Sequence, residues 1–152
     1  MKLKNAVTSR EISIPVEFKD KITVMANDFI TALDVRMFRI TLNSVKIQLQ
    51  KDNIDVSSLP HANVIFTRDG SFTLEQNENH IYGYRSNIIV YCMERLHYVN
   101  IPNFTFFTFI EELTHHYWNI EDEIEVKYKV LEIIGNSNVI ITIEDLKKWG
   151  LL

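Results

Sequence analysis

Apolar residues recur along this chain with two different periods, which predict a mixture of helices and strands. Over residues 16–33, apolar side chains recur at steps of three and four, the spacing of one face of an amphipathic helix. Over residues 37–50, apolar and polar side chains alternate, with one slip of phase at Asn43 and Ser44. This alternation predicts a long, bulged strand after the N-terminal helix.

The middle of the chain contains shorter apolar runs that predict further strands. Residues 63–67 and 71–75 alternate on either side of Asp69 and Gly70, and an Asp-Gly pair between such runs is typical of an antiparallel hairpin. Residues 87–93 are almost wholly apolar and aromatic, as expected for a strand that is covered on both faces. We therefore expect a small sheet in this part of the chain.

The C-terminal third predicts three helices. A proline suits the first turn of a helix over residues 102–118, and the pattern breaks at residues 119–120. A second helix is expected over residues 121–134, with acidic side chains in its first turn and a glycine after its end. Residues 142–145 resemble a capping box before a short helix over residues 146–149. The order helix, strands, helices predicts an α+β fold with a small, mostly antiparallel sheet.

Length and composition limit the kinds of protein that this chain can be. Its 152 residues, 46% of them hydrophobic, suffice for one core, so residues 1–152 are expected to form a single domain. The net charge of -4 argues against nucleic acid as a partner, because binding phosphates requires clustered Lys and Arg. Cys92 lies in an apolar run and is expected to be a buried structural thiol. Since no apolar segment reaches about 18 residues, we expect no membrane span and a cytoplasmic protein.

Carboxylates and imidazoles gather at helical spacing in residues 109–123, the part of the sequence that most clearly indicates a function. Glu111 and His115 lie one helical turn apart, about 5 to 6 Å at Cβ, so both head groups can ligate one ion. Glu112 is one step round the helix and can act as a general base on a metal-bound water. The opposite, core-facing stripe consists of Phe106, Phe109, Ile110, Leu113 and Tyr117.

The stretch Glu111-Glu-Leu-Thr-His-His-Tyr-Trp-Asn-Ile-Glu-Asp-Glu123 resembles the active-site signature of the zincin metallopeptidases. It is most similar to that of small bacterial proteins with a minimal zincin domain, whose motif reads H-E-x-x-H-H-F-G-x-x-D-E. The resemblance implies a minimal zincin-like fold, a peptide or protein substrate, and Glu112 as the general base. It implies a zinc ion with the ligands Glu111, His115 and Glu121, and Asp122 and Glu123 are alternatives for the third position.

Two residues of the stretch depart from the family motif. Glu111 stands where the family has its first histidine, and Trp118 stands where it has a turn-forming glycine. Two carboxylate ligands weaken the pull of zinc on a bound water, so that water is harder to deprotonate than at a histidine-rich site. The missing glycine implies that the helix ends in another way.

Other interpretations of the same residues remain open. One alternative is a non-catalytic binding or regulatory module descended from the zincin fold, which binds a peptide or protein partner. Another is a solvated surface, in which Glu123 and Lys127 form an ordinary i,i+4 pair. His116 lies about 100° round the helix from His115, so it is expected to be a half-buried, hydrogen-bonded side chain and not a ligand. The E-x-x-H spacing over residues 94–97 repeats that of residues 112–115, and two such motifs suit a di-iron or di-manganese helical bundle. The strands predicted over residues 37–93 argue against that fold.

Overall fold

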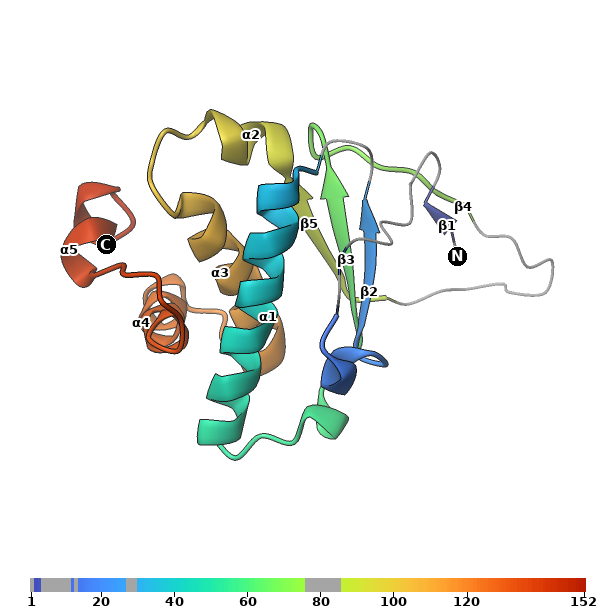
Figure 1. The fold of residues 1–152 in the computed structure, drawn as a ribbon, viewed down its shortest axis with the longest axis horizontal. Helices are drawn as coiled ribbons and strands as arrows, with labels where there is room; N and C mark the ends of the chain where they lie inside the picture. The colour runs from blue at the N-terminus through green and yellow to red at the C-terminus, as the bar shows by residue number, and fades with distance from the viewer. Residues whose placement is uncertain (1, 4–11, 13, 27–29, 76–85) are drawn as a thin grey trace.

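The computed structural model describes residues 2–3, 12, 14–26, 30–75 and 86–152. Its strands and helices are shown in Figure 1. The strands are β1 (Lys2–Leu3), β2 (Ile22–Ala26), β3 (Ala62–Thr67), β4 (Leu74–Glu75) and β5 (Ile88–Cys92). The helices are the short 3-10 turns η1 (Val16–Phe18) and η2 (Val56–Ser58), then α1 (Ala32–Lys51), α2 (Met93–Tyr98), α3 (Phe104–Trp118), α4 (Glu123–Ile134) and α5 (Ile143–Lys148).

The main sheet is parallel, so the predicted antiparallel sheet is wrong, although the chain does mix helices and strands. Its three strands lie in the order β2-β3-β5, and both neighbouring pairs are parallel. Helix α1 makes the crossover from β2 to β3, because two parallel strands cannot be joined by a tight turn. In Figure 1, α1 lies beside the sheet, with α3 behind it and with α4 and α5 farther from the strands.

Residues 37–50 form most of α1 and not a strand. The side chains of Phe38, Leu42, Val45 and Leu49 are completely buried, and their steps of four, three and four are those of one helical face. Ile47, which the alternation assigns to the buried face of a strand, is 38% exposed. The same four residues therefore fit two patterns, the alternation of a bulged strand and the spacing of a helical face. The structure adopts the helix.

The predicted helix over residues 16–33 and the predicted hairpin are also wrong. The first segment contains η1 and strand β2, where the β-branched residues Ile22, Thr23 and Val24 favour an extended backbone. Phe29, one of the apolar residues on which the helix prediction was based, lies outside the described residues. In the hairpin region the backbone bends at residues 68–70, and Gly70 has a positive φ of 91° that suits glycine. However, β4 pairs with β1 and not with β3.

The C-terminal helices confirm the sequence predictions closely. Helix α3 starts two residues after Pro102, and α4 has the side chain of Asp122 as its N-cap. The capping box of α5 is present, with Thr142 accepting from the Asp145 backbone and Asp145 accepting from the Thr142 backbone. Strands β3 and β5 also lie where they were predicted, although β5 buries only alternate side chains.

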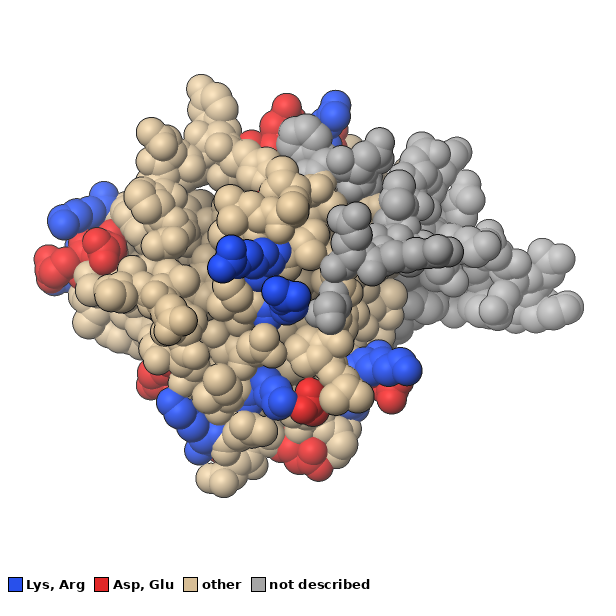
Figure 2. Space-filling view, viewed as in Figure 1, with Lys and Arg blue, Asp and Glu red and all other residues tan. Residues whose placement is uncertain are grey.

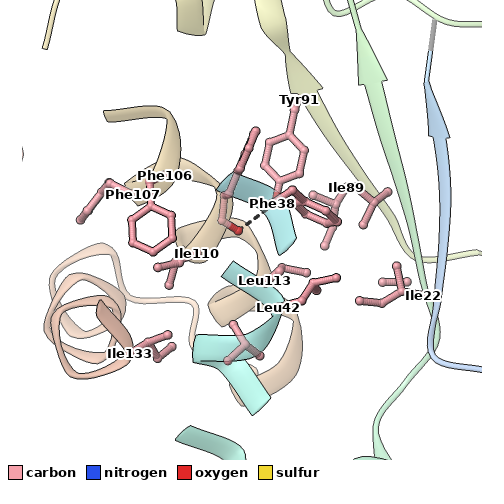
Figure 3. Packing of buried hydrophobic residues seen from close by; sticks show 14 of the residues in the cluster. Ile22, Phe38, Leu42, Ile89, Tyr91, Phe106, Phe107, Ile110, Leu113 and Ile133 are labelled. Atoms are coloured by element: carbon pink, nitrogen blue, oxygen red, sulfur yellow. Dashed lines mark hydrogen bonds between the residues drawn. The ribbon is translucent and has the colours of Figure 1, made fainter. Parts of the chain in front are cut away.

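An aromatic cluster joins α3 to the sheet. The Phe109 ring lies 4.8 Å from Tyr91, 5.5 Å from Phe66 and 5.6 Å from Phe38, measured between ring centroids. The buried hydroxyl of Tyr91 donates a hydrogen bond to the Phe109 carbonyl at 2.9 Å, drawn as the dashed line in Figure 3. All five predicted stripe residues of α3 are buried. This packing fixes the helix that carries the candidate site.

Figure 2 shows one face of the molecular surface. On this face a few basic side chains lie near the middle, and acidic and basic side chains both occur around the rim. Cys92 is half-buried, less than predicted, and its Sγ donates to the Arg68 carbonyl at 3.4 Å. No helix in the described part of the chain has the length and apolar character needed to cross a membrane.

Candidate functional site

The candidate site lies where the polar side of α3 meets the first turns of α4. Burial of the apolar stripe on α3 leaves Glu111, Glu112 and His115 at the half-buried margin of that helix. Helix α4 packs against α3 and brings Glu123 and Lys127, one turn apart, to the same margin. The sequence-predicted residues Glu111 and His115 therefore share a site with an acid and a lysine from the next helix.

Lys127 is a buried cation bound by carboxylates. Its side chain is only 8% exposed, and Nζ donates to the Glu123 carbonyl at 2.8 Å and to Glu123 Oε2 at 3.0 Å. Nζ also lies 3.8 Å from Oε1 of Glu111, whose side chain is 17% exposed. The pair of Glu123 and Lys127 has the predicted i,i+4 spacing, but its cation is in the protein interior and not in a solvated face.

His115 is held in one orientation by the turn between the two helices. Its Nδ1 lies 2.6 Å from the Ile120 carbonyl, and because a carbonyl only accepts, Nδ1 carries the hydrogen. The neutral ring then has its lone pair on Nε2, which lies 3.8 Å from Oε1 of Glu123. Fixing one ring nitrogen in this way is how proteins orient a histidine for a ligand or a proton.

Burial makes the two glutamates of α3 harder to ionise than exposed glutamates. Burial raises the pKa of Glu111, although the nearby charge of Lys127 opposes this shift. Burial also raises the pKa of Glu112, and His115 opposes it. By contrast, the hydrogen bond from Lys127 lowers the pKa of Glu123. The three carboxyl groups therefore differ in how readily they ionise.

We expect Glu112→Gln to raise the free energy of unfolding near pH 7. A carboxyl whose folded pKa lies above its ordinary value of 4.5 favours folding when it is protonated, and this contribution is lost as pH rises through the folded pKa. The glutamine side chain does not ionise, so the variant keeps its stability as pH rises. The stability gained by Glu112→Gln over wild type should therefore shrink as pH falls towards 4.5. Urea unfolding from pH 4 to pH 8 measures the difference, and a variant less stable than wild type at pH 7 would contradict the expectation.

Comparisons of the chain with protein-family models, curated proteins and solved structures find no match.

The donor set of this site does not fit a divalent metal as it stands. Within the described ranges, no three side chains of His, Cys, Asp or Glu lie together as a group that could hold an ion. The charges of the site also oppose a metal ion, because the carboxylates of Glu111 and Glu123 already face the ammonium group of Lys127. A zinc ion placed between them would be repelled by that ammonium at close range.

The third acid of the site is Glu123, which was one of the predicted alternatives. Glu121 is exposed in the link between the helices, and Asp122 is engaged as the N-cap of α4 through the backbone N–H groups of Ile124 and Glu125. Among the described residues, Glu123 is the one of these three acids with a carboxylate oxygen near the His115 ring, 3.8 Å from Nε2. His116 is half-buried as predicted and has a hydrogen bond with the Pro60 backbone, whereas its Nε2 has no hydrogen-bond partner in the described part of the chain.

Helix α3 ends at a left-handed asparagine, directly after Trp118. Asn119, one residue after Trp118, adopts the left-handed conformation with φ 53° and ψ 41°. Asparagine tolerates this region better than other non-glycine residues, so it takes over the turn. The indole Nε1 of Trp118 donates to Asp52 Oδ2 at 2.7 Å and so ties α3 to the end of α1.

Substitution of Asn119 should show this role directly. We expect Asn119→Ala to lose about 1 kcal/mol of stability, because alanine is strained at positive φ. Asn119→Gly should stay within a few tenths of a kcal/mol of wild type or exceed it, since glycine has no such strain. Thermal unfolding of both variants measures this, and equal losses from both would contradict a conformational role for Asn119.

Sequence reasoning missed two sets of residues around the site. Lys127 was interpreted as a surface side chain, although it lies three residues before the buried Val130 and seven before the buried Ile134, which places it at the edge of the core face. The second set surrounds Asp52. Burial disfavours its charge, but hydrogen bonds from Trp118, Gln48 and Lys129 hold the pKa of Asp52 below its ordinary value. No local pattern links Asp52 to Trp118 and Lys129, which lie 66 and 77 residues away in the sequence.

Proposed function

We propose that this chain is a non-catalytic binding or regulatory module that carries a zincin-like motif helix and recognises a peptide or protein partner without cleaving it. One observation carries the proposal: the carboxylates of the motif region are bound to the buried ammonium group of Lys127. An ammonium ion has no open coordination position. It therefore cannot lower the pKa of a bound water, which is what a metal supplies in metal-assisted hydrolysis.

A second candidate function is the zinc-dependent peptidase implied by the motif. The orientation of His115 favours it, because the contact of Nδ1 with the Ile120 carbonyl leaves Nε2 free to act as a ligand, 3.8 Å from Oε1 of Glu123. In that case Glu112, with its raised pKa, would be the residue that takes a proton. The peptidase stays a prediction, and its test is the same as that of the binding module.

The test exposes the full chain to a random peptide library and measures cleavage and binding separately. Mass spectrometry of the peptides detects cleavage, and immobilised protein washed with and without EDTA detects binding. We expect peptides that are retained whole on wild-type protein, on Glu112→Gln and on His115→Ala, with no effect of EDTA. Cleavage that EDTA abolishes and that both variants lack would establish the peptidase instead, and the absence of any retained peptide would also overturn the proposal.

A further inference from the structure

The position of Lys127 supports an inference that rests on the proposed non-catalytic function and explains it. We propose that Lys127 is the resident cation of the motif, and that its ammonium group opposes the binding of a divalent metal between Glu111, His115 and Glu123. The lysine side chain in this sense takes the place of a metal ion between the acidic side chains. Removal of that one side chain should then raise the affinity of these residues for zinc.

The contacts of the Lys127 ammonium group hold it between the two helices. Nζ donates to two oxygens of Glu123, one from the backbone and one from the side chain, and faces Glu111 from the other helix. The carboxylate of Glu111 is held in a half-buried position where a negative charge requires a nearby positive one. A positive group is therefore needed at this point in the fold, and Lys127 supplies it from within the chain.

The side chains around Lys127 have the chemistry of a zinc site. Zinc binds carboxylate oxygen and imidazole nitrogen, and two ligand atoms of one tetrahedral zinc lie roughly 3.4 Å apart when each bond is about 2.1 Å. The separation of His115 Nε2 and Glu123 Oε1 is 3.8 Å, close to that distance. The hydrogen bond from His115 Nδ1 to the Ile120 carbonyl supplies the outer contact that commonly orients a zinc-bound imidazole.

The neighbouring lysine of α4 does not provide a substitute for Lys127. Lys129 Nζ is bound by Asp52 at 3.2 Å and by Glu132 at 2.5 Å. It therefore belongs to the separate network that joins α4 to the end of α1. Loss of Lys127 should leave Glu111 and Glu123 without a bound cation from α4, and both can then turn towards an added ion.

The experiment titrates Zn²⁺ into the full chain by isothermal calorimetry, for wild type, Lys127→Ala and Lys127→Ala/His115→Ala. We expect Lys127→Ala to bind one zinc at least about tenfold more tightly than wild type, which corresponds to about 1.4 kcal/mol. The double variant should lose this gain. Lys147→Ala is the matched control, because it removes a lysine from an exposed pair with Glu144 and should bind zinc as wild type does.

Circular dichroism confirms that each variant is folded, and Lys127→Met replaces Lys127→Ala if the alanine variant does not fold. A folded Lys127 variant with no gain in zinc affinity would overturn this inference and leave the proposed binding function standing. A gain that survives His115→Ala would also overturn it, since the ion would lie elsewhere. Tight, stoichiometric zinc binding by wild type would overturn both proposals.

Discussion

Lys127→Met should lower the free energy of unfolding by about 1 to 3 kcal/mol at pH 7, the cost of leaving a buried charged group without its partner. The loss falls on Glu111, whose carboxylate then lacks the ammonium group that now lies 3.8 Å away. The cost stays below that of a fully buried ion because Glu111 can take up a proton. Urea unfolding followed by circular dichroism measures the change.

The pH dependence of this variant gives a further check. Burial already raises the pKa of Glu111 above 4.5, and removal of the opposing charge of Lys127 should raise it further. A carboxyl group with a raised pKa contributes stability that is present below pH 4.5 and is lost as pH rises through the pKa of the folded state. The loss of unfolding free energy in Lys127→Met should therefore be largest near pH 7 and smaller in acid.

Two comparison variants isolate the ion pair. Lys147→Met, at an exposed pair, should change stability by no more than about 0.5 kcal/mol. In the double variant Glu111→Gln/Lys127→Met, the loss should be smaller than the sum of the two single losses, because the stranded charge is gone. Strict additivity would show that Glu111 and Lys127 do not interact.

Phe109→Ala should be more destabilising still, by about 3 to 5 kcal/mol. Phe109 is completely buried, and its ring contacts three other aromatic rings from α1, β3 and β5. Alanine leaves a cavity that these rings cannot fill, since each is held by its own strand or helix. The melting temperature should fall by roughly 10 °C, as differential scanning calorimetry would measure.

Phe72→Ala is the control for the loss of an aromatic ring, because Phe72 is 40% exposed and its replacement should cost no more than about 0.5 kcal/mol. Phe109→Leu should lie between the two alanine variants, since leucine fills part of the space. A loss from Phe109→Ala no larger than that from Phe72→Ala would show that the aromatic cluster does not anchor α3.

The fold was predictable where one period dominated the sequence. Helices α3, α4 and α5 and strands β3 and β5 lie where their patterns and capping residues indicated. Helix α1 was not predicted, because its buried residues also fit an alternating pattern, yet a local signal was present. Thr31 and Asp34 have the same spacing as the capping box of α5, and they form a capping box at the start of α1.

The wrong prediction of an antiparallel sheet resulted from the failure to predict helix α1. Once residues 37–50 form a crossover helix, β2 and β3 can lie parallel, whereas a strand there favoured antiparallel neighbours. At the site, the sequence identified Glu111 and His115, but the ion pair between Glu111 and Lys127 depends on how α3 packs against α4. Such a contact between two helices is set by tertiary packing, which no spacing within one helix encodes.

The most direct test is elemental analysis of the full wild-type chain, purified from cells grown in zinc-supplemented medium and dialysed without a chelator. We expect zinc, iron and manganese all to be far below one ion per chain, because Lys127 already balances the carboxylates of Glu111 and Glu123. One tightly held ion per chain, absent from His115→Ala, would contradict a site closed by its own lysine.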